Sequence, residues 1–529
     1  MSAIPAMTPV AQAFFTSDAI YDNLKALLVS PEARRSDHRS LEKQIGKMGR
    51  ELLCSLFQNQ LDLRSSDDLE TFPRTPGGFS LTHHRPNESR QLMTVFGPVT
   101  VTRLGYSSRT NGTVQPLDAE LNLPKNLHSF GIIERVATAS ARGSYEQAAD
   151  VLEEHGGGHV AKRQVREMTL HAAQDFDSFY AQREVKTADD SKVPTAKSPQ
   201  QLMVLSTDGK GVVMRKESLR DNTRQQAEAK KPNRRDKRLR SGEKRQCKRM
   251  AQVAAVYDLE AWRRSTSDVA KALRPVQGAT SKRPKSQRKR VWASIKHDAK
   301  KVINDMFAES LRRDPGKNRT WIALVDGNIP QLRALESQAE NHKIPLTIVL
   351  DIIHVVEYLW KAVGCFRPPN SQDAEDWVTE RFLAILDGKV SQVAAGIRRS
   401  ATRQGLPTQD RATADICCNY LLGHKEYMRY DKYLATGLPV GTGVIEGACR
   451  YLVKDRMDLT GARWGLDGAE AVLQLRAMYT SGDLEEYWAY HSKMELARNH
   501  ASRFFAGEIP SLRHKNFRAE KTSHLRLVK

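Results

Sequence analysis

Three acidic residues have types and positions that could support chemistry on a phosphodiester. Asp208 follows the apolar run 202–207 and Asp326 follows the apolar run 320–325, and a glycine that permits a tight turn comes after each. Glu446 lies in the segment 442–458, which predicts a helix able to face these strand ends. Carboxylate oxygens are the ligands that Mg²⁺ prefers, and a pair of such ions can activate an attacking oxygen and stabilise a leaving one. The three residues therefore predict a phosphoryl-transfer site for two Mg²⁺ or Mn²⁺ ions.

Each of these residues also has a simpler interpretation. An Asp-Gly pair at a strand end is far more often a turn than a metal ligand. A single glutamate on a helix more often forms a salt bridge, and Arg450 and Lys454 follow Glu446 at helical spacing. The same two basic residues could instead bind phosphate beside the metal. The metal-site hypothesis depends on the joint occurrence of the three acids in a plausible order of strands and helices.

A fourth acidic residue, Asp351, follows the apolar run 345–350 and precedes a predicted helix. His354 then lies in the first turn of that helix and could face the same cleft as an auxiliary site residue. Spacing alone favours the alternative, in which Asp351 is a helix N-cap and His354 is a hydrogen-bonded histidine.

The elements that would position these residues follow an α/β order. Strands are predicted at 202–207, 212–214 and 251–259, then a helix with Val291, Ile295 and Phe307 on one face, then strands at 320–325 and 345–350 separated by a helix at 329–341. This order predicts a ribonuclease-H-like catalytic domain. Residues 369–436 are helical in pattern and predict an all-helical insertion before the last helix of that domain.

The residues before this domain predict a nucleic-acid-binding region. Residues 91–106 indicate a β-hairpin around Gly97 and Pro98. A helix that opens with a Ser144/Gln147 capping box, a glycine-rich break and a second, basic helix then form the outline of a helix-turn-helix. The outward residues of the second helix are the candidate DNA contacts: Lys162, Arg163, Gln164 and Arg166. A helical hairpin that only packs is the alternative.

The chain is therefore expected to be multidomain, α/β plus α. The predicted segments are an N-terminal helical region (1–80), the hairpin and helix-turn-helix region (81–184), a linker (185–200), the first part of the ribonuclease-H-like domain with a basic insert at 216–250 (201–368), the helical insertion (369–436), the final helices of the domain (437–485) and a basic C-terminal tail (486–529).

Composition and charge favour a nucleic-acid partner. With 83 Lys and Arg against 62 Asp and Glu, the 529 residues carry a formal charge of +21, and 40% are hydrophobic, which is a globular balance. Residues 216–250 contribute +9 and residues 282–301 contribute +8, so two blocks hold most of the excess. We expect them to wrap DNA or RNA backbone, with an inert solvated surface as the alternative. No apolar run predicts a membrane span or a secretion signal, and the six cysteines lack zinc-site spacing.

Four blocks together resemble bacterial insertion-sequence transposases of the ISKra type, which are relatives of the Mutator-like DDE transposases. The blocks are Ser206–Arg215 (STDGKGVVMR), Val325–Asn328 (VDGN), Asp351–Trp360 (DIIHVVEYLW) and Val444–Trp464 (VIEGACRYLVKDRMDLTGARW). The resemblance implies that Asp208, Asp326 and Glu446 are the catalytic and metal-binding carboxylates. Asp351 and His354 would be the short element between the second Asp and the Glu. Further nucleic-acid contacts would be Lys210, Arg450, Lys454, Arg456, Arg463 and Trp464.

By this resemblance, the protein binds transposon-end DNA and target DNA in the bacterial cytoplasm, associated with the nucleoid. It would cleave the DNA strand with the help of metal ions and transfer the new 3′-OH. Action on two ends implies a homo-oligomer, a dimer or larger, and the basic excess leaves room for RNA. Two alternatives are a non-enzymatic DNA-binding regulator derived from a transposase, and a ribonuclease-H-like nuclease without strand transfer.

The predicted helix-turn-helix can be tested by replacing Arg163 or Gln164 with alanine. If these residues contact base edges, each variant should lose about 1–3 kcal/mol of preference for the correct end sequence, measured as binding to end DNA against altered end DNA. An equal loss of affinity for all sequences would instead identify phosphate contacts.

Overall fold

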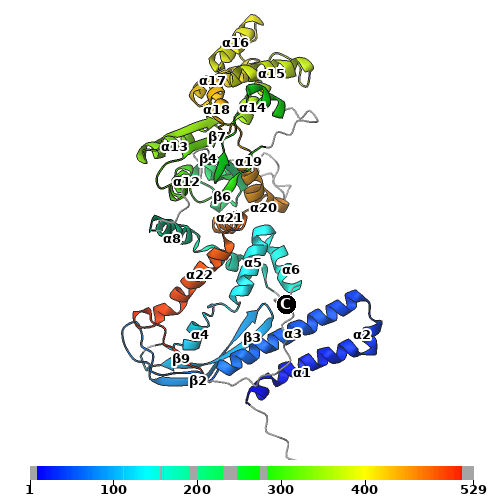
Figure 1. The fold of residues 1–529 in the computed structure, drawn as a ribbon, viewed down its shortest axis with the longest axis vertical. Helices are drawn as coiled ribbons and strands as arrows, with labels where there is room; N and C mark the ends of the chain where they lie inside the picture. Colours follow the sequence, from blue (N-terminus) through cyan, green and yellow to red (C-terminus); the bar gives the residue numbers. More distant parts are fainter. Residues whose placement is uncertain are drawn as a thin grey trace, which may run out of the picture. The chain divides into compact units, whose positions relative to one another are not determined.

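The computed structural model describes residues 9–110, 112–154, 158, 160–189, 201–229, 247–273 and 283–514 (Figure 1). The chain divides into two compact units. The first consists of Met1–Asp175 and Leu484–Lys529, and the second is Phe176–Asp483. No helix within the described ranges is long and apolar enough to cross a membrane.

The first unit combines a helical N-terminus with the predicted β-hairpin, which is confirmed. Its elements up to the hairpin are α1 (Pro9–Val29), α2 (Pro31–Arg35), α3 (His38–Arg64), β1 (Asp68–Leu69), β2 (His83–Thr94) and β3 (Gly97–Ser107). Helix α3 packs on the hairpin through a buried cluster that contains Leu61, Leu92 and Val101. Burial of these side chains stabilises the pairing, because an isolated hairpin is marginal in water.

The remaining helices of the first unit are α4 (Pro116–Glu120), α5 (Phe130–Arg142), α6 (Tyr145–Glu154), α7 (Lys162–Ala173) and α22 (Leu484–Asn499), followed by η5 (Ala501–Arg503), η6 (Phe505–Gly507) and β9 (Leu512–Arg513). The capping box is present: Ser144 N–H donates to Gln147 at 2.8 Å, and Gln147 N–H donates to Ser144 Oγ at 3.1 Å. Val165 and Met168 of α7 are buried as expected. Residues 155–157 of the predicted glycine-rich break lie outside the described residues.

The predicted basic tail at 486–529 is wrong for the residues that the structure describes. Helix α22 packs within the first unit, where the buried Tyr487 O–H donates to the carbonyl of Ala172 at 2.6 Å. Strand β9 pairs with β1, at the other end of the sequence. The tail prediction followed net charge, whereas the residues that hold α22 in place are polar and aromatic.

The second unit is built on a five-stranded mixed sheet, which confirms the α/β class. Its strands are β4 (Gln201–Val213), β5 (Lys248–Glu260), β6 (Gln287–Ser294), β7 (Thr320–Val325) and β8 (Leu346–Leu350). The order is β6-β5-β4-β7-β8, in which β5 is antiparallel to β4 and β6, while β7 and β8 run parallel to β4. Parallel strands bring their carboxyl ends to one edge of the sheet.

The predicted strands needed three corrections. The segments 202–207 and 212–214 are one continuous strand, so Asp208 lies within β4 and pairs with Val253 instead of ending the strand. The third strand is β6, and Val291, which was assigned to a helix face, belongs to it. Residues 248–250 of the predicted basic insert are part of β5, and the helix α8 (Phe176–Asp189) continues through the first five residues of the predicted linker.

Helices flank the sheet and form the insertion. Around the sheet lie α8 (Phe176–Asp189), η1 (Lys216–Ser218), α9 (Asp221–Ala229), α11 (Thr266–Leu273), α12 (Ala299–Arg313), α13 (Ile329–Asn341) and α21 (Leu466–Ser481). The predicted insertion at 369–436 is helical, with α15 (Gln372–Leu386), α16 (Val390–Arg403), α17 (Ala412–Gly423), η2 (Lys425–Tyr427) and α18 (Tyr430–Thr436) after α14 (Ile352–Val363).

The predicted helix at 442–458 is present but is not uniform. It consists of α19 (Gly443–Ala448), a π-helical turn η3 (Cys449–Lys454) and α20 (Asp455–Met457), and η4 (Leu459–Gly461) follows. A π turn has i→i+5 bonds and is frequent at functional sites. Its position directly after Glu446 changes which later residues share a face with that carboxylate.

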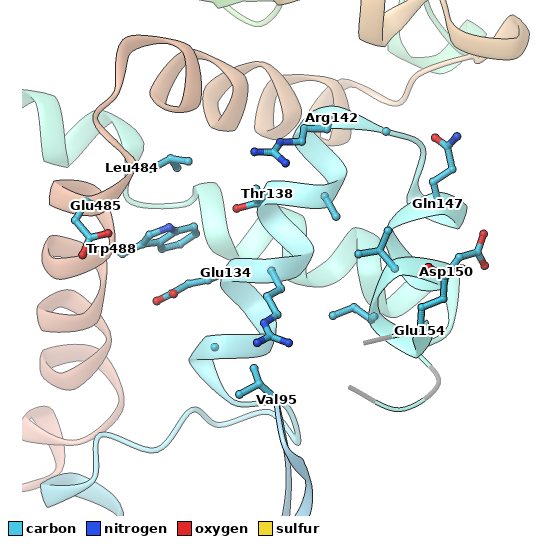
Figure 2. Close-up of a pocket in the computed structure, with 16 residues that line it drawn as sticks. Val95, Glu134, Thr138, Arg142, Gln147, Asp150, Glu154, Leu484, Glu485 and Trp488 are labelled. Atoms are coloured by element: carbon cyan, nitrogen blue, oxygen red, sulfur yellow. The ribbon is translucent and has the colours of Figure 1, made fainter. Parts of the chain in front are cut away.

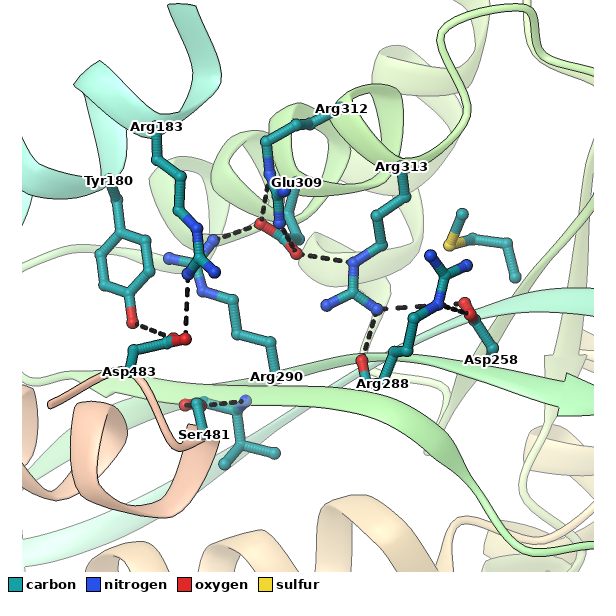
Figure 3. Close-up of polar contacts among 12 residues, drawn as sticks. Tyr180, Arg183, Asp258, Arg288, Arg290, Glu309, Arg312, Arg313, Ser481 and Asp483 are labelled. Atoms are coloured by element: carbon teal, nitrogen blue, oxygen red, sulfur yellow. Dashed lines mark hydrogen bonds and ion pairs between the residues drawn. The ribbon is translucent and has the colours of Figure 1, made fainter. Parts of the chain in front are cut away.

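A buried ion network links α12 to the sheet (Figure 3). Glu309 accepts from Arg290 at 2.5 Å and from Arg312 and Arg313 at 2.6 Å each. Asp258 of β5 pairs with Arg319 at 2.9 Å and with Arg288. Arg290 of the basic block 282–301 is buried in this network, which contradicts the expectation of a nucleic-acid contact for that residue, whereas Arg288 is exposed and the expectation stays a prediction for it. Segments 190–200 and 230–246 of the predicted linker and basic insert lie outside the described residues.

Replacing Glu309 by glutamine should reduce the free energy of unfolding by about 3–5 kcal/mol, because three arginines would lose a buried counter-charge. Burial disfavours the charged form, but the arginines hold the pKa of Glu309 well below its usual range. The stabilisation is therefore present at neutral pH and is lost as the pH falls through that lowered pKa. Denaturant unfolding at neutral and acidic pH measures both effects.

Asp305→Asn is the matched control, because Asp305 forms a solvent-exposed pair with Lys301 on the same helix. It should change stability by at most about 1 kcal/mol. Equal effects of the two substitutions would show that the buried network does not stabilise the unit.

Candidate functional site

Asp208 is held between the sheet and the helix that carries Glu446. The pairing of β4 with β7 ends at Ser206 and Leu324, so Asp208 lies two residues beyond the last partner on that side. Its carboxylate accepts from Gly209 N–H at 2.6 Å and from the thiol of Cys449 at 3.2 Å. The half-buried carboxylate is thus held by its own strand on one side and by the segment after Glu446 on the other.

Asp326 directly follows β7, as predicted, at a turn that requires glycine. Its side chain accepts from Asn328 N–H at 3.0 Å, and Asn328 caps α13. Gly327 has φ of +94°, and a Cβ there would lie 2.8 Å from Leu350. Tyr420, from the insertion, donates to the Asp326 carbonyl at 3.1 Å. The insertion therefore contacts the turn that carries this carboxylate.

Asp351 is buried and joins three elements. It follows β8, caps α14 by accepting from Ile353 N–H at 3.1 Å, and accepts from both the hydroxyl and the N–H of Thr442, the latter at 3.3 Å. Burial raises the pKa of Asp351, and the bonds from Thr442 and Ile353 oppose that rise. The N-cap interpretation of Asp351 is correct, and the same carboxylate also anchors the start of α19.

Asp351, His354 and Glu446 form the compact group of the site. One potential ligand atom from each lies within 4.8 Å of the other two. Burial and the charges of Asp351, Glu357 and Asp208 raise the pKa of Glu446, while His354 lowers it. Acidic residues that are far apart in sequence therefore act on one another at one place.

This group differs from the predicted triad in its membership. Glu446 groups with Asp351 and His354, while the charge of Asp208 also raises the pKa of Glu446 and the Asp208 carboxylate accepts from Cys449. Asp326 lies at the end of β7, the strand next to β4. The structure thus brings Asp351 and His354 into the centre of the site, although spacing alone favoured structural roles for them.

The predicted nucleic-acid contacts divide into exposed and buried residues. Arg450, Lys454 and Arg463 are exposed and Lys210 is half-buried. Arg456 and Trp464 are buried, with the Arg456 guanidinium 4.7 Å from the Trp464 ring centroid. Trp464 N–H and C=O bond to Val213 and Arg215, beside the end of β4. Both side chains pack in the interior, so their prediction as DNA contacts is wrong.

In the first unit, the candidate contacts on α7 are exposed. Lys162 lies 3.6 Å from Glu146, and Arg163 pairs with Glu167 at 3.0 Å. The side chain of Gln164 accepts from Ala161 N–H at 3.2 Å and so caps its own helix. Because these pairs are on the surface, breaking one of them to bind a phosphate or a base edge costs little free energy.

The first unit also contains an open groove of about 1370 Å³ between α5, α6 and α22 (Figure 2). Its charged lining residues are Glu134, Asp150, Glu154, Glu485, Arg135 and Arg142. Burial and the charge of Glu485 raise the pKa of Glu134. With more acidic than basic groups, this groove does not suit a polyanion.

Sequence reasoning missed Thr442, Cys449, Tyr420 and His424. Cys449 is three residues after Glu446, a helical spacing that could have indicated a shared face. His424 is buried and bonds the carbonyls of Tyr420 at 2.8 Å and Gly327 at 2.9 Å. Tyr420 and His424 come from the insertion, about a hundred residues from Asp326, so no local pattern could reveal them.

The donor atoms of this site fit a divalent cation. Carboxylates are ligands for Mg²⁺ and Mn²⁺, and an imidazole suits transition metals. Burial is the main cause of the raised pKa of Glu446, and the charges of Asp351, Glu357 and Asp208 add to it; a bound cation would relieve this repulsion. Comparison with models of known protein families and with curated proteins found no match to this chain.

Replacing Thr442 by valine should reduce the free energy of unfolding by about 1–3 kcal/mol, because the buried Asp351 carboxylate would lose its hydroxyl donor. Thr436→Val is the control, since the Thr436 hydroxyl bonds only carbonyls within its own exposed turn. Denaturant unfolding compares the two. Equal stability of the two variants would contradict the anchoring role of Asp351.

Proposed function

We propose that this protein is a DNA transposase that cleaves a DNA strand at a transposon end and joins the resulting 3′-OH to target DNA. The observation that carries the proposal is the convergence of Asp208, Asp351, His354 and Glu446 at one end of a mixed sheet. These residues belong to the blocks that resemble ISKra-type transposases.

The sheet supports the further proposal of a ribonuclease-H-like catalytic domain. Three antiparallel strands in sequence order are followed by two parallel strands on the other side of β4. The carboxylates lie on or after β4, β7 and β8, and the helical insertion separates β8 and α14 from α19. This arrangement places acids from distant segments around one edge, as a site for phosphoryl transfer needs.

In the proposed reaction, Asp208, Asp326 and Glu446 hold two Mg²⁺ or Mn²⁺ ions, and Asp351 and His354 complete the acidic edge. When bound, such ions activate the attacking oxygen and stabilise the leaving oxygen. Asp351 fixes the start of α19 through Thr442, and so positions Glu446. His354, half-buried in the first turn of α14, positions the scissile strand.

The exposed basic residues supply the DNA contacts in this proposal. Arg450, Lys454, Arg463 and Lys210 bind phosphates near the site, which provides affinity without sequence preference. Helix α7 reads the transposon end. Because two ends must be joined, we propose a dimer or larger assembly that works on DNA in the bacterial cytoplasm, with RNA as a further partner.

The test is strand cleavage of the DNA that flanks the coding region in its native genome, with Mg²⁺ or Mn²⁺. Asp208→Asn and Glu446→Gln should each reduce cleavage at least about a hundredfold, since several kcal/mol of charge stabilisation would be lost. Asp305→Asn, an acid-to-amide change on the surface of the same domain, should leave cleavage unchanged.

The products distinguish the proposal from its alternatives. Joined molecules that carry the cut end in new DNA support a transposase. Nicks without joined products would indicate a nuclease, and binding of the flanking DNA without either product would indicate a regulator. Full cleavage by Asp208→Asn would contradict the assignment of the site.

A further inference from the structure

A small pocket of about 290 Å³ lies beside the acidic group in the second unit. Its walls come from residues 257–264 at the end of β5, from residues 283–286 and from residues 437–444 before α19. Small-molecule pockets span roughly 300–1,000 Å³, so this pocket has room for about one nucleotide and not for a duplex.

One wall is held in place by a glycine. Trp262 N–H donates to the Gly437 carbonyl at 2.8 Å. Gly437 has φ of +85°, and a Cβ at this position would lie 2.8 Å from Trp262 N. Arg264 N–H also donates to the Leu434 carbonyl, at 3.2 Å. The segment with Trp262 and Arg264 is therefore fixed against the end of the helical insertion.

The charged residues that line the pocket are Arg264, Arg283 and Glu260, so positive charge is in excess. Arg264 donates through Nη2 to the Leu438 carbonyl at 3.0 Å, but its buried Nε has no hydrogen-bond partner among the described residues. Arg283 also lines the pocket, and burial together with the charge of Arg283 lowers the pKa of Arg264. Two guanidinium groups near each other fit an anion, and their planar donors match phosphate oxygens.

Aromatic side chains accompany these cations. The Trp262 ring lies 4.7 Å from the Arg264 guanidinium, and Tyr257 forms part of the same lining. Proteins that bind single nucleic-acid strands combine basic groups, which bind the phosphates, with aromatic rings, on which the bases stack. This pocket has both.

The pocket and the acidic group share a backbone segment. Gly441, Gly443 and Val444 line the pocket, and Glu446 follows on the same helix. A Cβ on Gly441 would lie 4.0 Å from Asp351 Oδ1. A nucleotide in the pocket would thus be next to the site proposed to act on its phosphodiester.

We propose that this pocket binds one unpaired nucleotide of the substrate strand, with its phosphate on Arg264 and Arg283 and its base stacked on Trp262. The identity of the substrate rests on the proposed function, whereas binding in the pocket does not require cleavage. The bound nucleotide fixes the position of the strand relative to Asp351, His354 and Glu446.

Two fluorescent probes test the pocket in metal-free full-length protein: 2-aminopurine deoxyribonucleoside 5′-monophosphate, and a single strand of about ten nucleotides that contains one 2-aminopurine. Stacking on Trp262 should quench the strand probe. Trp262→Ala should abolish this quenching and weaken binding about tenfold, while Trp262→Phe should bind nearly as wild type. Arg264→Ala should weaken binding by a similar factor.

Arg263→Ala is the matched control, because Arg263 is the exposed neighbour of Arg264 and its replacement by alanine removes the same positive charge. It should bind the strand as wild type does, and thermal melting confirms that each variant is folded. Equal binding by wild type, Trp262→Ala and Arg264→Ala would overturn the proposal, as would equal losses in Arg263→Ala and Arg264→Ala. Binding of the free nucleotide but not of the strand would overturn the assignment to a strand.

The cleavage assay separates this inference from the proposed function. Strand binding that depends on Trp262, in a protein that cleaves no DNA, would support the pocket and contradict the transposase. Cleavage and strand binding that are both unaffected in Trp262→Ala would support the transposase and overturn the pocket.

Discussion

The buried carboxylate of Asp351 is the interaction on which the arrangement of the candidate site depends. It ends the last strand of the sheet, begins α14, and binds Thr442, which is 91 residues further along the chain. Ile352 N–H donates to the Val440 carbonyl at 2.9 Å, beside this bond. The entire helical insertion lies between the two partners, so these bonds close the chain around it and return Glu446 to the sheet.

Strand β4 is paired along different lengths on its two sides, and this leaves Asp208 accessible. On one side β5 pairs with β4 along its whole length, whereas on the other side β7 stops at Ser206. Asp208 therefore lies on a rigid strand but has no strand neighbour on the β7 side. The end of β4 is in turn bound by Trp464. A carboxylate can thus be rigidly held and still remain accessible to a ligand.

Sequence patterns predicted the elements whose structure depends on neighbouring residues, and failed where distant residues decide. The helix at 329–341 was correct because Asn328 caps it and Pro330 suits its first turn. The strand at 287–294 was missed because Val291 and Ile295 have helical spacing, while its pairing with β5 is non-local. Arg456 and Trp464 have the residue types of a nucleic-acid contact, but tertiary packing places them inside. The polar residues that fix α22 carry no hydrophobic signal, and the partners of Asp351 come from a distant segment.

The π-helical turn at Cys449–Lys454 has a consequence for how this chain can tolerate insertions and deletions. A π turn carries the equivalent of one additional residue in an α-helix. Loss of one residue there would restore regular α geometry, with no change in any side chain of the acidic group. Because the π turn takes up its extra residue locally, the segment that follows would keep its orientation relative to Glu446, and Arg456 and Trp464 would stay in the interior. A change of one residue in length is therefore tolerated better at this turn than elsewhere in the helix, where each residue gained or lost rotates the following chain by about 100°.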